Sequence, residues 1–293
     1  MKITGVTIIK NAVKNDYPIV EAINSILPVV DEMIVSIDKG EDHTESLIRA
    51  ISSEKLKIVY STWDMSLRKG GEVLAVETNK VISQVSPDTD WIFYIQADEA
   101  VHEKYHPVIL EAAKKYLDNK NIDGLLFKYL HFYGTYDYVG DSRKWYNCET
   151  RIIRNDPTIS AYRDAQGFRR GKNKISVAAI PAYIYHYGWV KSPQQMKIKQ
   201  KNVSHFWNSD SEKFTEFLES SDLYNFQDYD SVTRFTGTHP EVMRSRIERK
   251  NWKLTLDTNK KNMGLKDKFL HFFERLTGKR LFSFANHKVI AKF

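Results

Sequence analysis

Two adjacent carboxylates, Asp98 and Glu99, come shortly after an apolar run at residues 91–95. The run predicts a buried strand, so both carboxylates would lie at its carboxyl end. Mg²⁺ and Mn²⁺ prefer carboxylate oxygens, and they commonly take one or two from the protein and others from phosphate. Asp98 is therefore a candidate metal ligand. The plain alternative is a turn in which Asp98 caps a helix.

His186 is the second candidate metal ligand. It lies among aromatic residues in a strand-like run at residues 182–189. Imidazole is a common ligand of Mn²⁺ and related metals, although a lone histidine on an apolar strand also fits a packed, hydrogen-bonded role. Because a metal needs several ligands, Asp98 and His186 together predict a Mn²⁺ or Mg²⁺ site better than either residue does alone.

Two further segments have the chemistry of a nucleotide site. Asp38 ends a predicted strand, where a carboxylate can accept hydrogen bonds from ribose hydroxyls or a base N–H; a simple turn is the alternative. Arg68 precedes Gly70 and Gly71, and it supplies charge for a diphosphate where glycines let the backbone approach closely. The Gly-Lys-Ser/Thr ending of a Walker A loop is absent.

Asp164 is the candidate general base. It lies among polar and aromatic residues at 161–168, in the later half of the chain. A base that takes a proton from an acceptor hydroxyl is expected there, facing the reacting carbon. Asp141 and Glu149 are rival candidates, and each of the three also fits a structural role.

The elements that would position these residues alternate along the first half of the chain. Strands are predicted at residues 3–9, 33–38, 57–60, 91–95 and 124–129, and helices at 17–27, 44–51, 72–85 and 107–117. This alternation predicts an α/β fold, with a mostly parallel sheet flanked by helices and joined by right-handed crossovers. Ligands of such sheets bind beyond the carboxyl ends of the strands, which is where the candidate residues stand.

The later part of the chain has a different pattern. Short strand-like pieces are predicted at residues 150–153, 174–177 and 182–185, and the region from residue 193 is predicted to be mostly helical. A helix at 266–276 is amphipathic, with one face formed by Phe269, Leu270, Phe273 and Leu276. Residues 241–293 contain fourteen Lys and Arg against five Asp and Glu, a net +9 in a chain of net +7. A basic end favours anionic partners such as nucleic acid or anionic lipid, although a solvated helical face is the plainer interpretation.

Size and composition bound the class of protein. The chain has 293 residues, of which 42% are hydrophobic, enough for one large α/β domain with an appendage. Its single cysteine, Cys148, excludes an intrachain disulfide and fits a reducing compartment. The first ten residues are typical of a strand rather than a leader, and no apolar run approaches the roughly 20 residues of a membrane span. We expect a cytoplasmic protein, with at most peripheral contact at the inner face of the membrane.

Several of these motifs resemble the bacterial family 2 glycosyltransferases, which have the GT-A fold. The segment from Thr7 to Asn11 resembles the first donor-binding strand and loop of that family. The segment that begins at Asp38 resembles the stretch that meets the nucleotide, with Lys39 in place of its second Asp. The helix that carries Asn79 resembles the helix after the third strand of the family.

The metal-binding motif of the family has a counterpart as well. Residues 95–99 resemble its Leu-Asp-Ala-Asp-Glu form, with Gln96 in place of the first Asp and Asp98 as the surviving ligand. The resemblance covers about the first 190 residues. It implies a GT-A-like catalytic domain at 1–190, with a nucleotide-sugar-binding half at 1–130 and an acceptor-facing half at 131–190. A helical C-terminal extension would follow at 191–293.

The resemblance implies transfer of a sugar from a nucleotide-diphosphate sugar, with inversion and with Mn²⁺ or Mg²⁺ as cofactor. A UDP-sugar is the favoured donor, and the acceptor is an unidentified saccharide, lipid-linked molecule or protein. Residue chemistry and the resemblance together give the candidate residues: Thr7, Asn11, Asp38, Arg68, Asn79 and Gln96 for the donor, Asp98 and His186 for the metal, and Asp164 as the base.

Two other functions remain open from the sequence. A sugar nucleotidyltransferase of related fold would carry a glycine-rich loop after the first strand, and residues 10–14 contain no glycine. A non-catalytic module could bind anionic membrane or nucleic acid through the basic C-terminal region. Membrane contact is compatible with transferase activity, and no nucleic acid partner is expected for a transferase.

Overall fold

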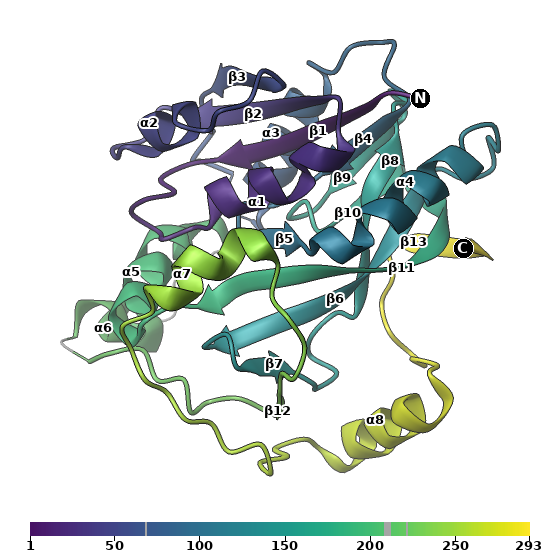
Figure 1. Cartoon of the computed structure of the whole chain (residues 1–293). Coiled ribbons are helices and arrows are strands. Elements are labelled where there is room, and N and C mark those ends of the chain that lie inside the picture. Colours follow the sequence, from purple (N-terminus) through teal and green to yellow (C-terminus); the bar gives the residue numbers. More distant parts are fainter. Residues whose placement is uncertain (68, 208–211, 221) are drawn as a thin grey trace.

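The computed structural model describes residues 1–67, 69–207, 212–220 and 222–293. Its first half is a parallel sheet in the order β3-β2-β1-β4, as Figure 1 shows. The strands are β1 (Ile3–Ile9), β2 (Glu32–Asp38), β3 (Leu56–Ser61) and β4 (Trp91–Tyr94). Each parallel neighbour needs a crossover connection, and the helices between these strands supply it. The predicted α/β fold is confirmed in this half.

The second half of the sheet is mixed rather than mostly parallel. It contains β6 (Gly124–Gly134), β8 (Cys148–Arg154) and the long strand β11 (Asn173–Val190). β8 runs antiparallel to both β4 and β6, whereas β11 runs parallel to β6. No helix separates β6 from β8, so the chain turns back beside β6 without a crossover. The parallel order that the first half of the chain predicts is therefore found in β1 to β4 and gives way here to mixed pairing.

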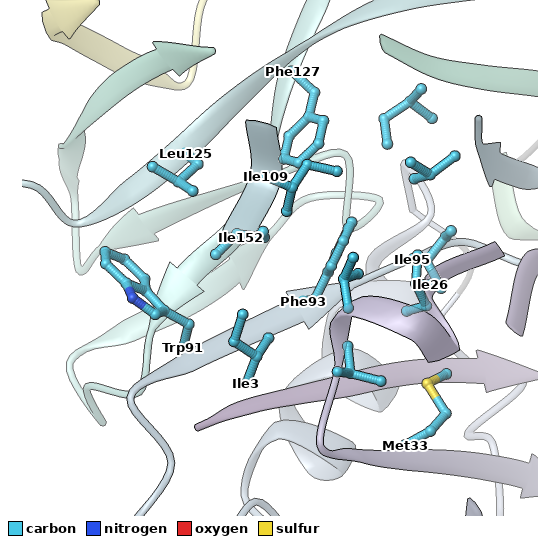
Figure 2. Packing of buried hydrophobic residues seen from close by; sticks show 14 of the residues in the cluster. Ile3, Ile26, Met33, Trp91, Phe93, Ile95, Ile109, Leu125, Phe127 and Ile152 are labelled. Carbon is cyan, nitrogen blue, oxygen red and sulfur yellow. The ribbon is translucent and has the colours of Figure 1, made fainter. Parts of the chain in front are cut away.

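Helices cover both faces of the sheet. The helices are α1 (Ile19–Ile26), α2 (Thr44–Arg49), α3 (Glu72–Ile82) and α4 (His106–Lys115). Successive strand residues point to opposite faces, so Trp91 and Phe93 join the cluster packed with α1 and α4, which Figure 2 shows. Their neighbours Ile92 and Tyr94 join the cluster packed with α3. Burial on both faces explains why these strands are almost wholly apolar.

Smaller strands attach to the main sheet near β11. They are β5 (Glu99–Val101), β7 (Tyr138–Gly140) and the hairpin of β9 (Ile159–Tyr162) and β10 (Gly167–Arg170). β5 pairs antiparallel with β11, and the hairpin extends the sheet beyond β11 through β10. Short 3₁₀ helices lie at Leu27–Val29, Glu103–Tyr105, Ser204–Trp207 and Glu241–Met243. The two strand pieces predicted at 174–177 and 182–185 are parts of the one strand β11.

The region after residue 190 is less helical than predicted. Its helices are α5 (Pro193–Val203), α6 (Glu212–Glu219), α7 (Arg244–Glu248) and α8 (Leu265–Thr277). It also contains β12 (Val232–Arg234), which pairs with β7, and β13 (His287–Lys292), which pairs parallel with β11. The β-branched pair in the middle of β13 favours a strand, and an edge of β11 accepts it. The division at residue 190 stays a prediction.

Within the described ranges, none of the helices combines the length and the apolar character that crossing a membrane requires.

Candidate active site

A cavity of about 840 Å³ opens beyond the carboxyl ends of β1 and β4. The loop after β1 contributes Asn11, the turn after β4 contributes Gln96 and Asp98, and β11 contributes His186. The loop between β9 and β10 contributes Asp164. Five predicted site residues from distant parts of the sequence therefore line one cavity, at the end of the sheet where open α/β folds bind ligands.

Helix α5 forms another wall of this cavity. Its lining residues include Lys199, Asn202 and Val203. The cavity thus draws on both sides of residue 190, and the C-terminal region is part of the site.

Asp98 and His186 lie side by side at the floor of the cavity. Nε2 of His186 is 3.7 Å from Oδ1 of Asp98, and both side chains are largely buried. The backbone N–H of Tyr187 donates to the carbonyl of Asp98 at 2.7 Å, and β5 places His186 opposite Glu99 in its ladder with β11. Pairing between the two strands therefore brings together the two side chains predicted as metal ligands.

The approach of these two side chains depends on Gly188. A Cβ atom at Gly188 would lie 2.5 Å from Oδ2 of Asp98 and 2.8 Å from Cε1 of His186. Both distances are far shorter than ordinary van der Waals contact of roughly 3.5–4.0 Å. β11 also bulges here, because His186 pairs with His131 on β6 and Trp189 pairs with Tyr133, three residues against two.

A chain of hydrogen bonds fixes the ring of His186. Nε2 of His131 contacts the carbonyl oxygen of Tyr146 at 2.8 Å, and a carbonyl only accepts, so Nε2 carries the proton. Nδ1 of His131 is then an acceptor for Nδ1–H of His186, at 3.2 Å. Nε2 of His186 is left with its lone pair toward Asp98. Burial lowers the pKa of both imidazoles and favours these neutral forms.

This arrangement fits a bound cation. A neutral Nε2 and the carboxylate of Asp98 are both acceptors, so facing each other they favour a positive charge between them. Burial opposes ionisation of Asp98, and Lys199 beside it favours the charged carboxylate. Among the described residues no group of three or more His, Cys, Asp or Glu converges. The protein would thus offer two ligands and leave others to phosphate, as Mg²⁺ and Mn²⁺ sites often do.

Lys199 was not predicted from the sequence. Its Nζ lies 3.4 Å from Oδ2 of Asp98 and donates to the carbonyl of Gly188 at 2.8 Å. The ammonium group therefore sits at the same carboxylate that would bind a metal, beside the cavity. The sequence signal was slight, because alternate lysines on a polar helix usually face solvent.

Glu99 has a structural role. Arg151 on β8 donates two hydrogen bonds to its carboxylate, through Nε at 2.9 Å and Nη2 at 2.8 Å, and the hydroxyl of Tyr129 donates a third at 2.7 Å. The backbone N–H of Gln96 also donates to Glu99, at 3.0 Å. This fully buried ion pair fixes the turn that presents Asp98. Arg151 was another residue that the sequence did not single out.

Asp164 occupies a strained turn between β9 and β10. The residues on either side of it, Arg163 and Ala165, both have φ of 57°, which costs on the order of 1 kcal/mol for each side chain with a Cβ. Strain of this kind is often kept where it aims a functional side chain. Burial raises the pKa of Asp164 above that of an ordinary Asp, which strengthens it as a base.

Asp141 and Glu149, the two rivals of Asp164, are not among the described residues that line the cavity. Asp141 accepts from Nζ of Lys261 at 3.1 Å and from the hydroxyl of Ser231, so it is held in a surface network. Glu149 is buried, and burial together with the charge of Asp164 raises its pKa to about 8. Its Oε2 has no hydrogen-bond partner among the described residues.

Two of the predicted donor-binding residues reach the cavity. Asn11 has φ of 53°, and its Oδ1 accepts from the N–H of Glu41 at 3.0 Å. A Cβ at Gly40 would overlap that oxygen, so the glycine is needed for this turn. Gln96 lines the cavity beside Tyr94.

The other donor-binding candidates lie elsewhere. Asp38 is buried against two residues that line the cavity: it pairs with Lys10 at 2.7 Å and accepts from the N–H of Trp63 at 3.1 Å. Thr7 is buried within β1. Oδ1 of Asn79 accepts from the N–H of Ala161 at 2.7 Å, a bond that ties α3 to β9. None of these three residues is among those that line the described cavity, although Asp38 contacts two that do, and Arg68 lies outside the described residues.

Comparison with known proteins gives similarities of structure only. No protein-family model and no curated protein matches the sequence. S. aureus TarS matches over 74% of this chain and 41% of its own, with 15% identity and a TM-score of 0.38. Its 1–349 fragment with UDP matches over 74% of this chain and 71% of its own, with 15% identity and a TM-score of 0.37.

A second similar structure is glucosyl-3-phosphoglycerate synthase from Mycobacterium tuberculosis, solved with Mn²⁺, UDP and phosphoglyceric acid. It has 26% identity and a TM-score of 0.30, over 44% of this chain and 43% of its own. The chain spans about two fifths of full TarS.

Proposed function

We propose that the protein is a metal-dependent glycosyltransferase that transfers a sugar from a nucleotide-diphosphate sugar with inversion. The observation that carries the proposal is the pair of Asp98 and His186, whose acceptor atoms converge 3.7 Å apart at the floor of a large cavity. A cation held there would supply charge neutralisation for the diphosphate of the donor. UDP-sugars remain the favoured donors, and Mn²⁺ or Mg²⁺ the favoured metals.

The cavity also has the charge that a diphosphate needs. Its lining includes Lys10, Lys14, Lys144, Lys199 and Lys201, against the carboxylates Glu41, Asp98 and Asp164. Lys199 lies closest to the metal pair, so its ammonium group is placed to donate to a phosphate oxygen of the donor. Lysine side chains that line a cavity attract the donor and oppose the charge that builds up as the nucleoside diphosphate leaves.

Asp164 is the base in this mechanism. Its carboxylate takes the proton of the acceptor hydroxyl as that oxygen attacks the anomeric carbon. The new carbon–oxygen bond forms on one face while the bond to the diphosphate breaks on the other. The leaving group departs with the bonding electron pair, and attack from the opposite face inverts the configuration. Trp145 and Trp189 line the cavity and can stack on sugar rings. Tyr136 and Tyr138 could also stack on a sugar by their chemistry, but both are buried in core clusters.

A ligand screen tests the proposal. We expect UDP-sugars with Mn²⁺ to raise the melting temperature of the protein, because a ligand at 100 times its Kd stabilises by about 2.7 kcal/mol. Asp98→Asn should lose the Mn²⁺-dependent part of the shift and the hydrolysis of donor while keeping the melting temperature of the free protein. Full activity in excess chelator, or no response to any nucleotide sugar, would contradict the proposal.

A further inference from the structure

Helix α8 presents a stripe of large apolar side chains to solvent. Leu265, Phe269, Phe272 and Leu276 are 87%, 67%, 65% and 73% exposed. Their spacing of four, three and four residues places them on one side of the helix. The sequence had suggested one apolar face with Leu270 and Phe273 included. In the structure Leu270 is buried, and the exposed stripe is a separate second face.

Charged residues of α8 are sorted around this stripe. At about 100° per residue, Lys268 and Arg275 flank it on one side and Lys266 on the other. The acidic residues Asp267 and Glu274 fall on the opposite side of the helix. Glu274 faces the protein, where it pairs with Arg143 at 2.7 Å. An apolar stripe bordered by exposed lysine and arginine is the pattern of a helix that lies in the surface of an anionic membrane.

The helix is joined to a wall of the cavity. Arg143 binds Glu274 of α8, and Arg280, just after α8, donates to the carbonyls of Arg143 and Trp145 at 2.6 and 2.7 Å. The residues that follow Arg143, from Lys144 to Tyr146, line the cavity. Figure 1 shows α8 at the edge of the molecule, apart from the main sheet.

We propose that α8 docks the protein on an anionic lipid surface, with its exposed stripe in the headgroup region and its basic residues against lipid phosphates. Through the loop of Arg143 the docked helix holds the cavity near the membrane, so the acceptor is a molecule anchored there. This last step rests on the proposed glycosyltransferase function, whereas the docking does not. A second copy of the chain fits the stripe poorly, because two-fold pairing would bring the same basic residues together.

Vesicle flotation with the full-length protein tests the docking. We expect binding to vesicles of phosphatidylcholine with about 30% phosphatidylglycerol, weakening in about 0.5 M NaCl, and little binding to phosphatidylcholine alone. The double variant Phe269→Ser/Phe272→Ser should bind at least roughly tenfold more weakly, because each phenylalanine contributes apolar burial. Leu110→Ser, which removes an exposed leucine from α4, is the matched control and should bind like the wild type.

The possible results separate cleanly. Failure of the wild type to bind anionic vesicles, or equal binding by the double variant, would overturn the proposal. So would a dimer in light scattering that the double variant abolishes, or binding to single-stranded RNA in place of vesicles. The double variant should still hydrolyse a soluble UDP-sugar at the wild-type rate. If no variant and no wild type uses a nucleotide sugar, the proposed function fails while the vesicle result stands.

Discussion

Replacing Gly188 by alanine is a direct test of the site, because the new methyl group would lie between the two proposed metal ligands. Its carbon would stand 2.5 Å from Oδ2 of Asp98 and 2.9 Å from Nε2 of His186. Restoring ordinary contact of roughly 3.5 Å requires Oδ2 to retreat by about 1 Å and Nε2 by about 0.6 Å. The atoms that must move are the ones that would hold the cation, so binding should suffer more than folding.

The expected magnitudes follow from this geometry. Overpacking costs about 1–3 kcal/mol, and here we expect the lower end because side-chain tips can yield more easily than backbone. A loss of 1 kcal/mol lowers the melting temperature of a domain of this size by about 2–4 °C. Displacing or tilting a metal ligand weakens metal affinity by about 10–100-fold. The two effects therefore differ widely in size.

Calorimetric titration with Mn²⁺ and donor hydrolysis over a range of Mn²⁺ concentrations measure the effect on the site. Gly264→Ala is the control, because a Cβ there meets no atom within 4 Å. We expect Gly188→Ala to need far more Mn²⁺ for the same rate, and Gly264→Ala to match the wild type. Unchanged Mn²⁺ affinity in Gly188→Ala would refute the assignment of Asp98 and His186 as ligands.

Three further outcomes are expected. Asp164→Asn should lower the transfer rate by roughly 10²–10⁴-fold with little change in donor affinity. The wild-type rate should fall as pH drops through the raised pKa of Asp164, because the protonated carboxyl is no longer a base. Unchanged transfer kinetics in the variant would exclude this residue as the base. Lys199→Ala should bind Mn²⁺ more tightly in calorimetry, because the ammonium group that competes for Asp98 is removed. The same variant should bind UDP more weakly, by about tenfold or more. A change of the same sign in both affinities would contradict this role. Glu149 has a folded-state pKa of about 8, above its ordinary value of 4.5, so the folded protein binds the extra proton and stability should decrease as pH rises from about 4.5 to 8. Urea unfolding should show this slope flattened in Glu149→Gln, and an equally steep slope in the variant would place its source elsewhere.

The sequence predicted the parallel half of the fold well, because strands buried on both faces are marked by unbroken apolar runs. β1 has the bounds that were predicted, and β2 and β3 begin or end within one residue of their predictions. The second half was harder to predict. β11 joins two pieces that the sequence separated, because a strand of 18 residues with bulges loses its regular alternation.

Only those residues of the candidate site whose side-chain type suggests a function could be predicted from the sequence. Asp98 and His186 were paired because a metal needs several ligands, and the structure places them together. Lys199 and Arg151 were missed, since neither has a local pattern and both act through partners far along the chain. Asn79 looked like a donor contact, but its amide instead satisfies a backbone N–H of β9. Such pairings appear only when the tertiary contacts are known.

The bulge of β11 between His186 and Trp189 affects both the proposed metal site and the proposed sugar-binding surface. In a regular strand neighbouring residues face opposite ways, yet Gly188 and Trp189 both border the cavity. Because of the extra residue, two consecutive residues face the cavity. Gly188 leaves room for a cation beside His186, and Trp189 provides an aromatic surface next to it. Removing a single residue from this step would turn the indole of Trp189 away from the cavity and leave the rest of the sheet paired, so the proposed donor and acceptor sites would be lost together.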